Sequence, residues 1–111
     1  MRRMTDGDGN GGAIRLRVSD AVAVPLRGML LRLRVLEGRP RIKQFGRGSR
    51  LRLQAPHGPE RTVEIIDLGV TGGRQTQQRL ETVGEVDLMI STDDALRDGD
   101  PVEIGWTATP A

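Results

Sequence analysis

The sequence contains no cysteine, one histidine and only two aromatic residues, Phe45 and Trp106. The absence of cysteine excludes disulfide bonds and thiolate metal sites. With so few aromatic side chains, the core must be built from Leu, Val and Ile, and stacking on the bases of a single-stranded nucleic acid is disfavoured. One histidine and serines only at positions 19, 49 and 91 leave little material for a nucleophile–base–orienter triad, so we predict no catalytic residues.

Long apolar runs and nucleotide-binding motifs are also missing. No stretch approaches the ~20 apolar residues that a membrane-spanning helix needs, and Arg2 and Arg3 precede no apolar segment of a secretory signal. We therefore expect a cytoplasmic protein that has no membrane partner. The chain has no Gly-x4-Gly-Lys-Ser/Thr pattern, so we expect no GTP binding and no cofactor.

Two features offer possible metal ligands without the spacing that a metal site requires. Four aspartates lie close together, Asp93, Asp94, Asp98 and Asp100, but they lack the register of a calcium-binding EF-hand loop. We interpret them as a solvated turn and predict no metal site. The one histidine, His57, lies among prolines and a glycine and is expected to be an exposed turn residue.

Basic and acidic residues are distributed unevenly along the 111 residues. The first 52 residues contain 13 Lys and Arg against 4 Asp and Glu (+9), and the others contain 4 against 11 (−7), which gives the net charge of +2. Such asymmetry is typical either of a nucleic-acid-binding face or of two halves that pair with each other in the fold. All the basic residues except Lys43 are arginines, which bind carboxylate and phosphate groups in a bidentate manner.

Alternation of apolar and polar residues predicts a series of short strands. The expected strands cover residues 14–18, 21–24, 29–36, 50–54, 61–70, 85–90 and 102–106. Turn signals separate strands at residues 19–20, 25–28, 37–38 and 56–59. Helical turns are expected at most at residues 74–82 and 93–97. The pattern predicts an all-β antiparallel barrel of six or seven strands, a single domain at residues 13–108 that follows a disordered tail at residues 1–12.

The two-residue period of the strands places their charged residues on the outer face of the barrel. Arginines occupy this face in pairs two residues apart: Arg15/Arg17, Arg32/Arg34 and Arg50/Arg52. Either these arginines pair across strands with outward acids, or some of them form a strip that binds phosphate or RNA. The outward acids are Glu64, Glu85, Asp87 and Glu103. In the last strand, Val102, Ile104 and Trp106 are expected to face the core.

The order of these features resembles the second domain of the elongation factor Tu-type translation GTPases. The resemblance rests on an aspartate and short apolar strand at residues 20–24, the bend at 25–28, and the long strand that ends at Glu37 and Gly38. It continues with strands at residues 48–53, 63–70, 84–90 and 102–106 and an acidic turn at 94–99. It implies a Greek-key barrel that stands alone, without the GTPase domain, and serves as a binding platform.

The basic segment at residues 39–47 is longer than the usual turn of that family and is the strongest candidate for a partner site. The predicted binding residues are Arg27, Arg39, Arg41, Lys43, Phe45 and Arg47. Phe45 either plugs the end of the barrel or forms an exposed anchor between cations. We predict a non-catalytic module that binds a protein or RNA partner through this basic edge. The alternative is a self-associating structural barrel with no ligand site.

A glycine-rich loop at residues 71–76 is a further candidate. Backbone amides in such a loop can hold an anion, but the loop lacks the strand–loop–helix context of a dinucleotide site. We interpret it mainly as a flexible connection, with anion binding as the alternative.

Overall fold

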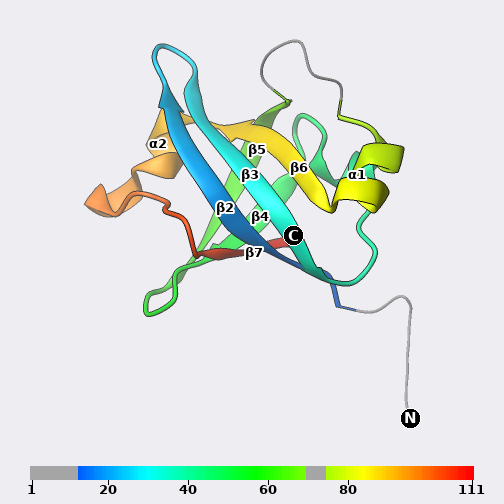
Figure 1. Cartoon of the computed structure of the whole chain (residues 1–111). Coiled ribbons are helices and arrows are strands. Elements are labelled where there is room, and N and C mark those ends of the chain that lie inside the picture. The colour runs from blue at the N-terminus through cyan, green and yellow to red at the C-terminus, as the bar shows by residue number, and fades with distance from the viewer. Residues whose placement is uncertain (1–12, 70–74) are drawn as a thin grey trace.

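The computed structural model describes residues 13–69 and 75–111, which form a closed barrel of six antiparallel strands (Figure 1). The strands are β2 (Arg15–Val24), β3 (Gly28–Glu37), β4 (Arg50–Gln54), β5 (Glu60–Leu68), β6 (Glu85–Ile90) and β7 (Thr107–Pro110). Their order around the barrel is β2-β3-β6-β5-β4-β7, with β7 closing onto β2. The predicted all-β antiparallel barrel is confirmed. The predicted disordered tail at residues 1–12 and the predicted strand end at residue 70 lie outside the described residues.

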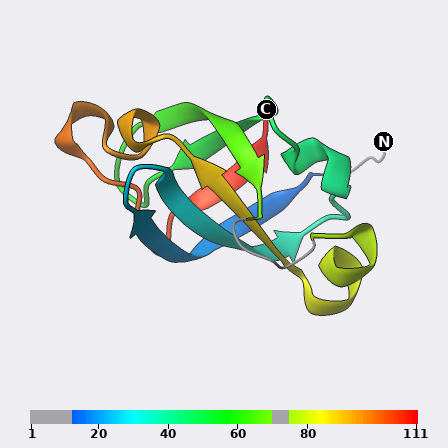
Figure 2. The ribbon, with the colours of Figure 1, turned by 90° about the horizontal axis from the view of Figure 1, so that it is seen from above.

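Short helical segments connect some of the strands: η1 (Ile42–Phe45), α1 (Gln77–Val83), α2 (Thr92–Ala95) and η2 (Arg97–Gly99). Helix α1 begins where the Thr76 hydroxyl accepts a hydrogen bond from the Arg79 backbone N–H (3.1 Å). It ends at Gly84, whose φ of 75° is a left-handed conformation that glycine tolerates. Two views place α1 and α2 on opposite sides of the barrel (Figure 1 and Figure 2). No helix within the described ranges is long and apolar enough to cross a membrane.

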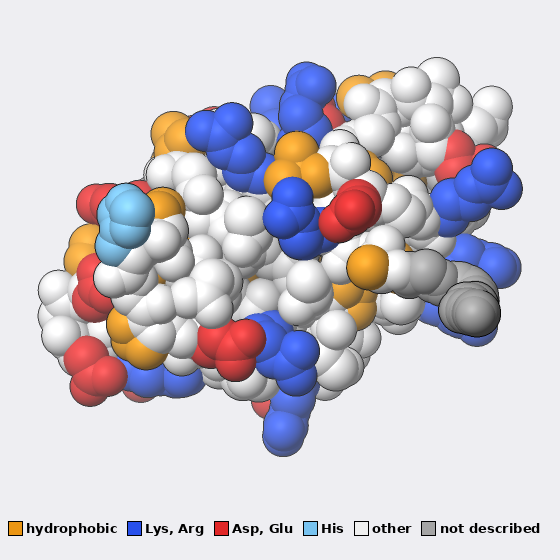
Figure 3. All heavy atoms as spheres, turned by 90° about the horizontal axis from the view of Figure 1, so that it is seen from below, with side chains coloured by type: hydrophobic (Ala, Val, Ile, Leu, Met, Phe, Trp, Pro, Cys, Tyr) orange, Lys and Arg blue, Asp and Glu red, His pale blue; other side chains and the backbone are white. Residues whose placement is uncertain are grey.

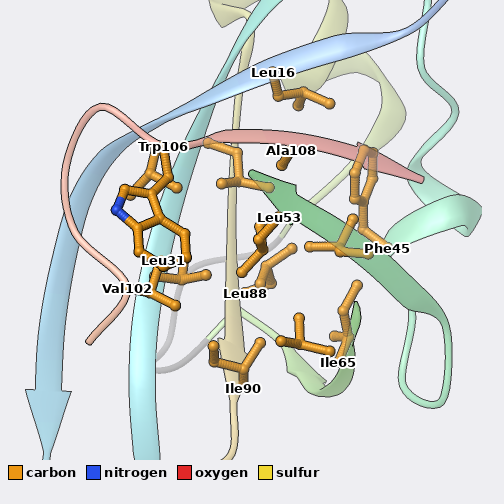
Figure 4. Packing of buried hydrophobic residues seen from close by; sticks show 14 of the residues in the cluster. Leu16, Leu31, Phe45, Leu53, Ile65, Leu88, Ile90, Val102, Trp106 and Ala108 are labelled. Carbon is orange, nitrogen blue, oxygen red and sulfur yellow. The ribbon is translucent and has the colours of Figure 1, made fainter. Parts of the chain in front are cut away.

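The barrel interior is aliphatic, as the composition predicts. Because side chains alternate between the two faces of a strand, Leu31 and Leu33 of β3 and Ile65 of β5 all point inward and are fully buried. Figure 4 shows Phe45 and Trp106 on opposite sides of this cluster, with aliphatic side chains between them. Each fully buried side chain of this size contributes about 1.5–3 kcal/mol, so the cluster is the main source of stability.

The predicted turn at residues 19–20 is wrong, because β2 continues through it as one ten-residue strand. Val18 pairs with Leu33 and Asp20 pairs with Arg32, which leaves Ser19 as the extra residue of a β-bulge. A bulge bends a strand without ending it, so small polar residues that usually signal a turn are compatible with continued pairing here.

The predicted last strand at residues 102–106 is also wrong. Val102 and Trp106 are buried, but Ile104 is 58% exposed, and the strand β7 begins only at Thr107. The backbone of this segment bonds elsewhere, since the Val102 N–H donates to the Ala95 carbonyl (2.9 Å), a contact that no strand ladder makes. Strand β7 then reaches Pro110, two residues beyond the predicted domain boundary.

The predicted bend at residues 25–28 is confirmed as the tight turn between β2 and β3. The Arg27 N–H donates to the Val24 carbonyl (3.0 Å), and Leu26 at the tip has a φ of 66° and a fully exposed side chain. A left-handed conformation costs a non-glycine residue about 1 kcal/mol, so leucine is unfavourable here. Gly28 is required because a Cβ atom at this position would collide with the Ile90 carbonyl oxygen.

Candidate binding groove beside the basic segment

A groove of about 630 Å³ lies between helix α1 and the chain that follows β3. The residues that line it are Val35, Gly38, Arg39, Pro40, Arg41, Gln77, Leu80, Glu81 and Gly84. Pro40 and Leu80 are buried, whereas Arg39, Arg41 and Glu81 are exposed. The groove therefore combines an apolar base with a charged rim that carries two cations and one anion.

Gln77 fixes α1 against the basic segment. Its side-chain oxygen accepts a hydrogen bond from the Ile42 backbone N–H (2.7 Å), and its side-chain nitrogen donates to the Pro40 carbonyl (3.4 Å) and to Glu81 (2.7 Å). At the other end of the helix, the Gly84 carbonyl accepts a hydrogen bond from the Val35 N–H (2.8 Å). Both walls of the groove are thus held by hydrogen bonds in the absence of any ligand.

Three of the four basic residues of this segment make no ion pair within residues 13–69 and 75–111. No described Asp or Glu lies within ion-pair distance of Arg39, Arg41 or Lys43. Arg39 and Arg41 share the groove, while Lys43 lies on η1 and does not line it. The two arginines therefore present positive charge to solvent at one place.

Arginines on the barrel wall lie in a different environment, because the strand register brings acids opposite to them. Arg32 makes a bidentate contact with Asp87 (2.9 and 3.1 Å), and Arg34 pairs with Glu85 (3.3 Å). The hydrogen bonds to Asp87, and then the attraction of its charge, raise the pKa of the Arg32 guanidinium. Cross-strand pairing, one of the two alternatives for these arginines, is confirmed for Arg32 and Arg34.

Two further wall pairs are Arg15–Glu37 (3.4 Å) and Arg52–Glu60 (3.8 Å). Exposed ion pairs of this kind contribute at most about 1 kcal/mol each. On the face seen from below, basic and acidic side chains are interspersed rather than gathered into a field of one sign (Figure 3). The barrel wall therefore offers a phosphate backbone no continuous basic strip on that face.

The remaining predicted site residues lie apart from the groove. Arg27 and Arg47 both approach Asp67, at 3.9 and 4.0 Å, and so share one carboxylate of β5. Phe45 is fully buried in the core, which makes the alternative of an exposed anchor wrong. Its aromatic ring is the large apolar group that fills this end of an otherwise aliphatic barrel. Of the six predicted residues, the groove brings together Arg39 and Arg41 alone.

The sequence analysis missed the contribution of α1 to the groove. Gln77, Leu80 and Glu81 line it, yet the segment was predicted to be a loop or a helical turn. The available signal was a threonine at position 76 and a glycine at 84, a spacing that fits the two caps of a short helix.

Arg61 is a second residue whose role the sequence analysis missed. Its guanidinium is buried and donates to the carbonyl oxygens of Asp94 (3.0 Å), Ala95 (3.2 Å), Arg97 (3.1 Å) and Asp100 (2.6 Å). It also lies 5.0 Å from the centre of the Trp106 ring, a favourable cation–π geometry. Residues two apart on a strand share a face, so the inward position of Val63 could have predicted that the Arg61 side chain also points inward.

The other candidate chemistry yields no site. The residues that the structure describes contain no cluster of His, Asp or Glu arranged to hold a metal ion. Asp94 instead accepts a hydrogen bond from the Glu64 N–H (3.2 Å) and contacts Arg97, and His57 is exposed in the β4–β5 turn. Most of the glycine-rich loop, at residues 71–74, lies outside the described residues.

Compared with family models, with curated proteins and with solved structures, this chain matches none of them. In the part of the chain that the structure describes, the groove combines a built cavity, an apolar base and two cations that have no ion-pair partner there.

Proposed function

We propose that this chain is a non-catalytic binding module that holds an acidic segment of a partner protein in the groove beside α1. The observation that carries the proposal is the position of Arg39 and Arg41, two cations above an apolar base that have no ion-pair partner among the described residues. A guanidinium binds a carboxylate in bidentate fashion, so acidic side chains suit this rim. An apolar side chain of the same segment would pack on Pro40 and Leu80.

A protein partner fits the groove better than RNA. The chain next to the lining residues exposes apolar surface, since Leu36 is 46% and Val83 is 48% exposed. Glu81 lies on the rim of the groove and would repel a phosphate backbone that followed it. An amphipathic peptide can place its acids away from Glu81 and bury its apolar side chains, whereas evenly spaced phosphates cannot.

The fold type supports a role as a platform. Strands β4, β5 and β6 follow one another in the chain and lie side by side in the sheet. The last of them, β6, also pairs with β3, so the four strands lie in the order 3-6-5-4. That order is typical of a Greek key, in which three consecutive strands are joined by a fourth that returns beside the first. We propose that this barrel is of the translation-factor domain 2 type.

The test is fluorescence anisotropy with labelled ten-residue peptides that alternate Glu with Leu. We expect binding that weakens as salt is raised, because exposed charges are screened. The double variant Arg39→Glu, Arg41→Glu should weaken binding at least about tenfold, the equivalent of 1.4 kcal/mol. The matched control is Arg17→Glu, Arg50→Glu, which changes the same charge on the barrel wall, away from the groove.

Two results would overturn the proposal. One is that the acidic peptide does not bind at low salt, or that it binds but the wall variant lowers its affinity as much as the groove variant does. The other is that a labelled 20-nucleotide RNA binds more tightly and displaces the peptide, which would make RNA the partner of this surface.

A further inference from the structure

Strand β2 has an open edge in its second half. Its pairing with β7 covers only Leu16 and Arg17, and the last backbone bonds on that side join Val18 to Gly105 and Trp106 (2.9 and 2.8 Å). Beyond this point, residues 20–24 pair with β3 and with no other strand among residues 13–69 and 75–111. The Ala21 N–H donates to the Asp20 carboxylate (3.0 Å), a bond that an added strand would have to replace. The other outward backbone N–H and C=O groups of residues 20–24 have no partner among the described residues and are available to a further strand.

Between the bulge at Ser19 and Pro25, this edge has little protection against association. Natural edge strands are commonly guarded by lysines or other inward charges, but residues 20–24 read Asp-Ala-Val-Ala-Val and carry one charge, at the first position. Val22 is 44% exposed, Ala23 is exposed, and the tip beyond them presents the fully exposed Leu26. Apolar side chains and free backbone groups therefore coincide at one margin of the molecule.

We infer that this edge pairs with the same edge of a second copy of the chain, antiparallel about a twofold axis near Val22. In that register Ala21 faces Ala23 of the second copy and Asp20 faces Val24, so no like charges are opposed. The net charge of +2 adds little repulsion between copies. The edge is self-complementary, which is the condition for an isologous contact.

Features at both ends of this edge limit the assembly to a dimer. The bulge at Ser19 limits the ladder on one side, and Pro25, which has no N–H to donate, limits it on the other. Every strand of the barrel already has two neighbours, so one such edge per molecule gives a closed dimer and no fibre. A ladder of this length is a small interface, so we expect a dissociation constant on the order of 100 μM.

The dimer leaves the groove free. In Figure 2 the β2–β3 hairpin lies at one end of the molecule and α1 at the other. The inference does not rest on the proposed function, because it uses a different surface and needs no ligand.

Sedimentation equilibrium of the intact chain between about 5 and 500 μM tests the inference. We expect the dimer fraction to rise with concentration, and Val22→Lys to weaken dimerisation at least about tenfold. The control is Val83→Lys, which adds the same charge at a valine of similar exposure (48% against 44%) on α1. A monomer at all concentrations, or equal loss in both variants, would overturn the inference.

A second measurement does not depend on the folding of any variant. In the natural chain, hydrogen exchange of the amides at residues 20–24 should slow as concentration rises, while exchange in β6 should not change. If exchange at residues 20–24 is the same at both ends of the concentration range, the edge is not the dimer contact and the inference fails.

Discussion

The two ends of the barrel use arginine in opposite ways. At the α2 end, the Arg61 guanidinium is buried and its hydrogen bonds are spent on four backbone carbonyls. At the α1 end, Arg39 and Arg41 are exposed beside a groove and have no described carboxylate within ion-pair distance. The same residue type therefore bonds the backbone at one end of the fold and faces solvent at the other.

The difference follows from what surrounds each guanidinium. Near Arg61, the ends of α2 and η2 direct four carbonyl groups at one point, and a planar fork of N–H donors bonds all four. The Ala95 and Arg97 carbonyls also accept backbone bonds, from Val102 and Asp100. Near Arg39, the Pro40 carbonyl and Glu81 bond Gln77 instead of an arginine. Arg39 and Arg41 have no ion-pair partner among the described residues, and their guanidinium groups face solvent.

The largest expected effect is at the α2 end. We expect Arg61→Met to lower the free energy of unfolding by about 3 kcal/mol, because four hydrogen bonds to buried or part-buried carbonyls and the cation–π contact with Trp106 are lost while the apolar volume is kept. Urea unfolding measures it. The control is Arg52→Met, whose side chain is about half exposed and makes one long ion pair. Equal losses in the two variants would remove the distinction between the two ends.

An intermediate effect is expected where α1 joins the basic segment. Gln77→Ala should lower the free energy of unfolding by about 1.5 kcal/mol, because the Ile42 N–H and the Pro40 carbonyl lose their partner. It should also weaken binding of the acidic peptide, since the groove walls are no longer joined. Gln78→Ala, on the exposed side of the same helix, should change neither quantity. A stability loss without a binding loss would contradict the role given to this wall.

The smallest expected effect is a difference in stability between variants of the groove arginines and a variant of a wall arginine. Arg39→Gln, Arg41→Gln should leave the free energy of unfolding unchanged within error, because neither side chain has a described internal partner. Arg32→Gln should lower it by about 0.5 kcal/mol through loss of the exposed pair with Asp87. Urea denaturation at low salt measures the free energy of unfolding of both variants. A destabilised groove variant would indicate that these arginines are structural.

Strand alternation predicted most of the barrel because one face of each strand is buried. Leu31 and Leu33, and likewise Leu51 and Leu53, leave one choice of inward face, and the tight turns around them are marked by proline and glycine. Two residues of the basic segment, Arg39 and Arg41, line the groove, while the prediction that they bind a partner stays a prediction.

What the sequence could not supply depends on contacts between distant segments. Residues 102–106 alternate like a strand, but Val102 bonds Ala95 and Trp106 packs under Arg61. The alternation of apolar residues here reflects the burial of Val102 and Trp106 and not the hydrogen bonds of a β-strand. The groove itself needs α1, which lies 35 residues beyond its hydrogen-bond partner Ile42. Neither contact can be predicted from the residues near it in the sequence, because each forms only when the barrel closes.

The Arg61 contacts also have a consequence for the order of folding and for local opening. Arg61 lies at the start of β5, and its acceptors follow 33 to 39 residues later. The α2 segment can therefore be held only after β5 has been placed, which puts it late in assembly. In the native state, withdrawal of one side chain releases four carbonyls together, so residues 94–100 should exchange their amide hydrogens as one cooperative unit before the barrel itself opens.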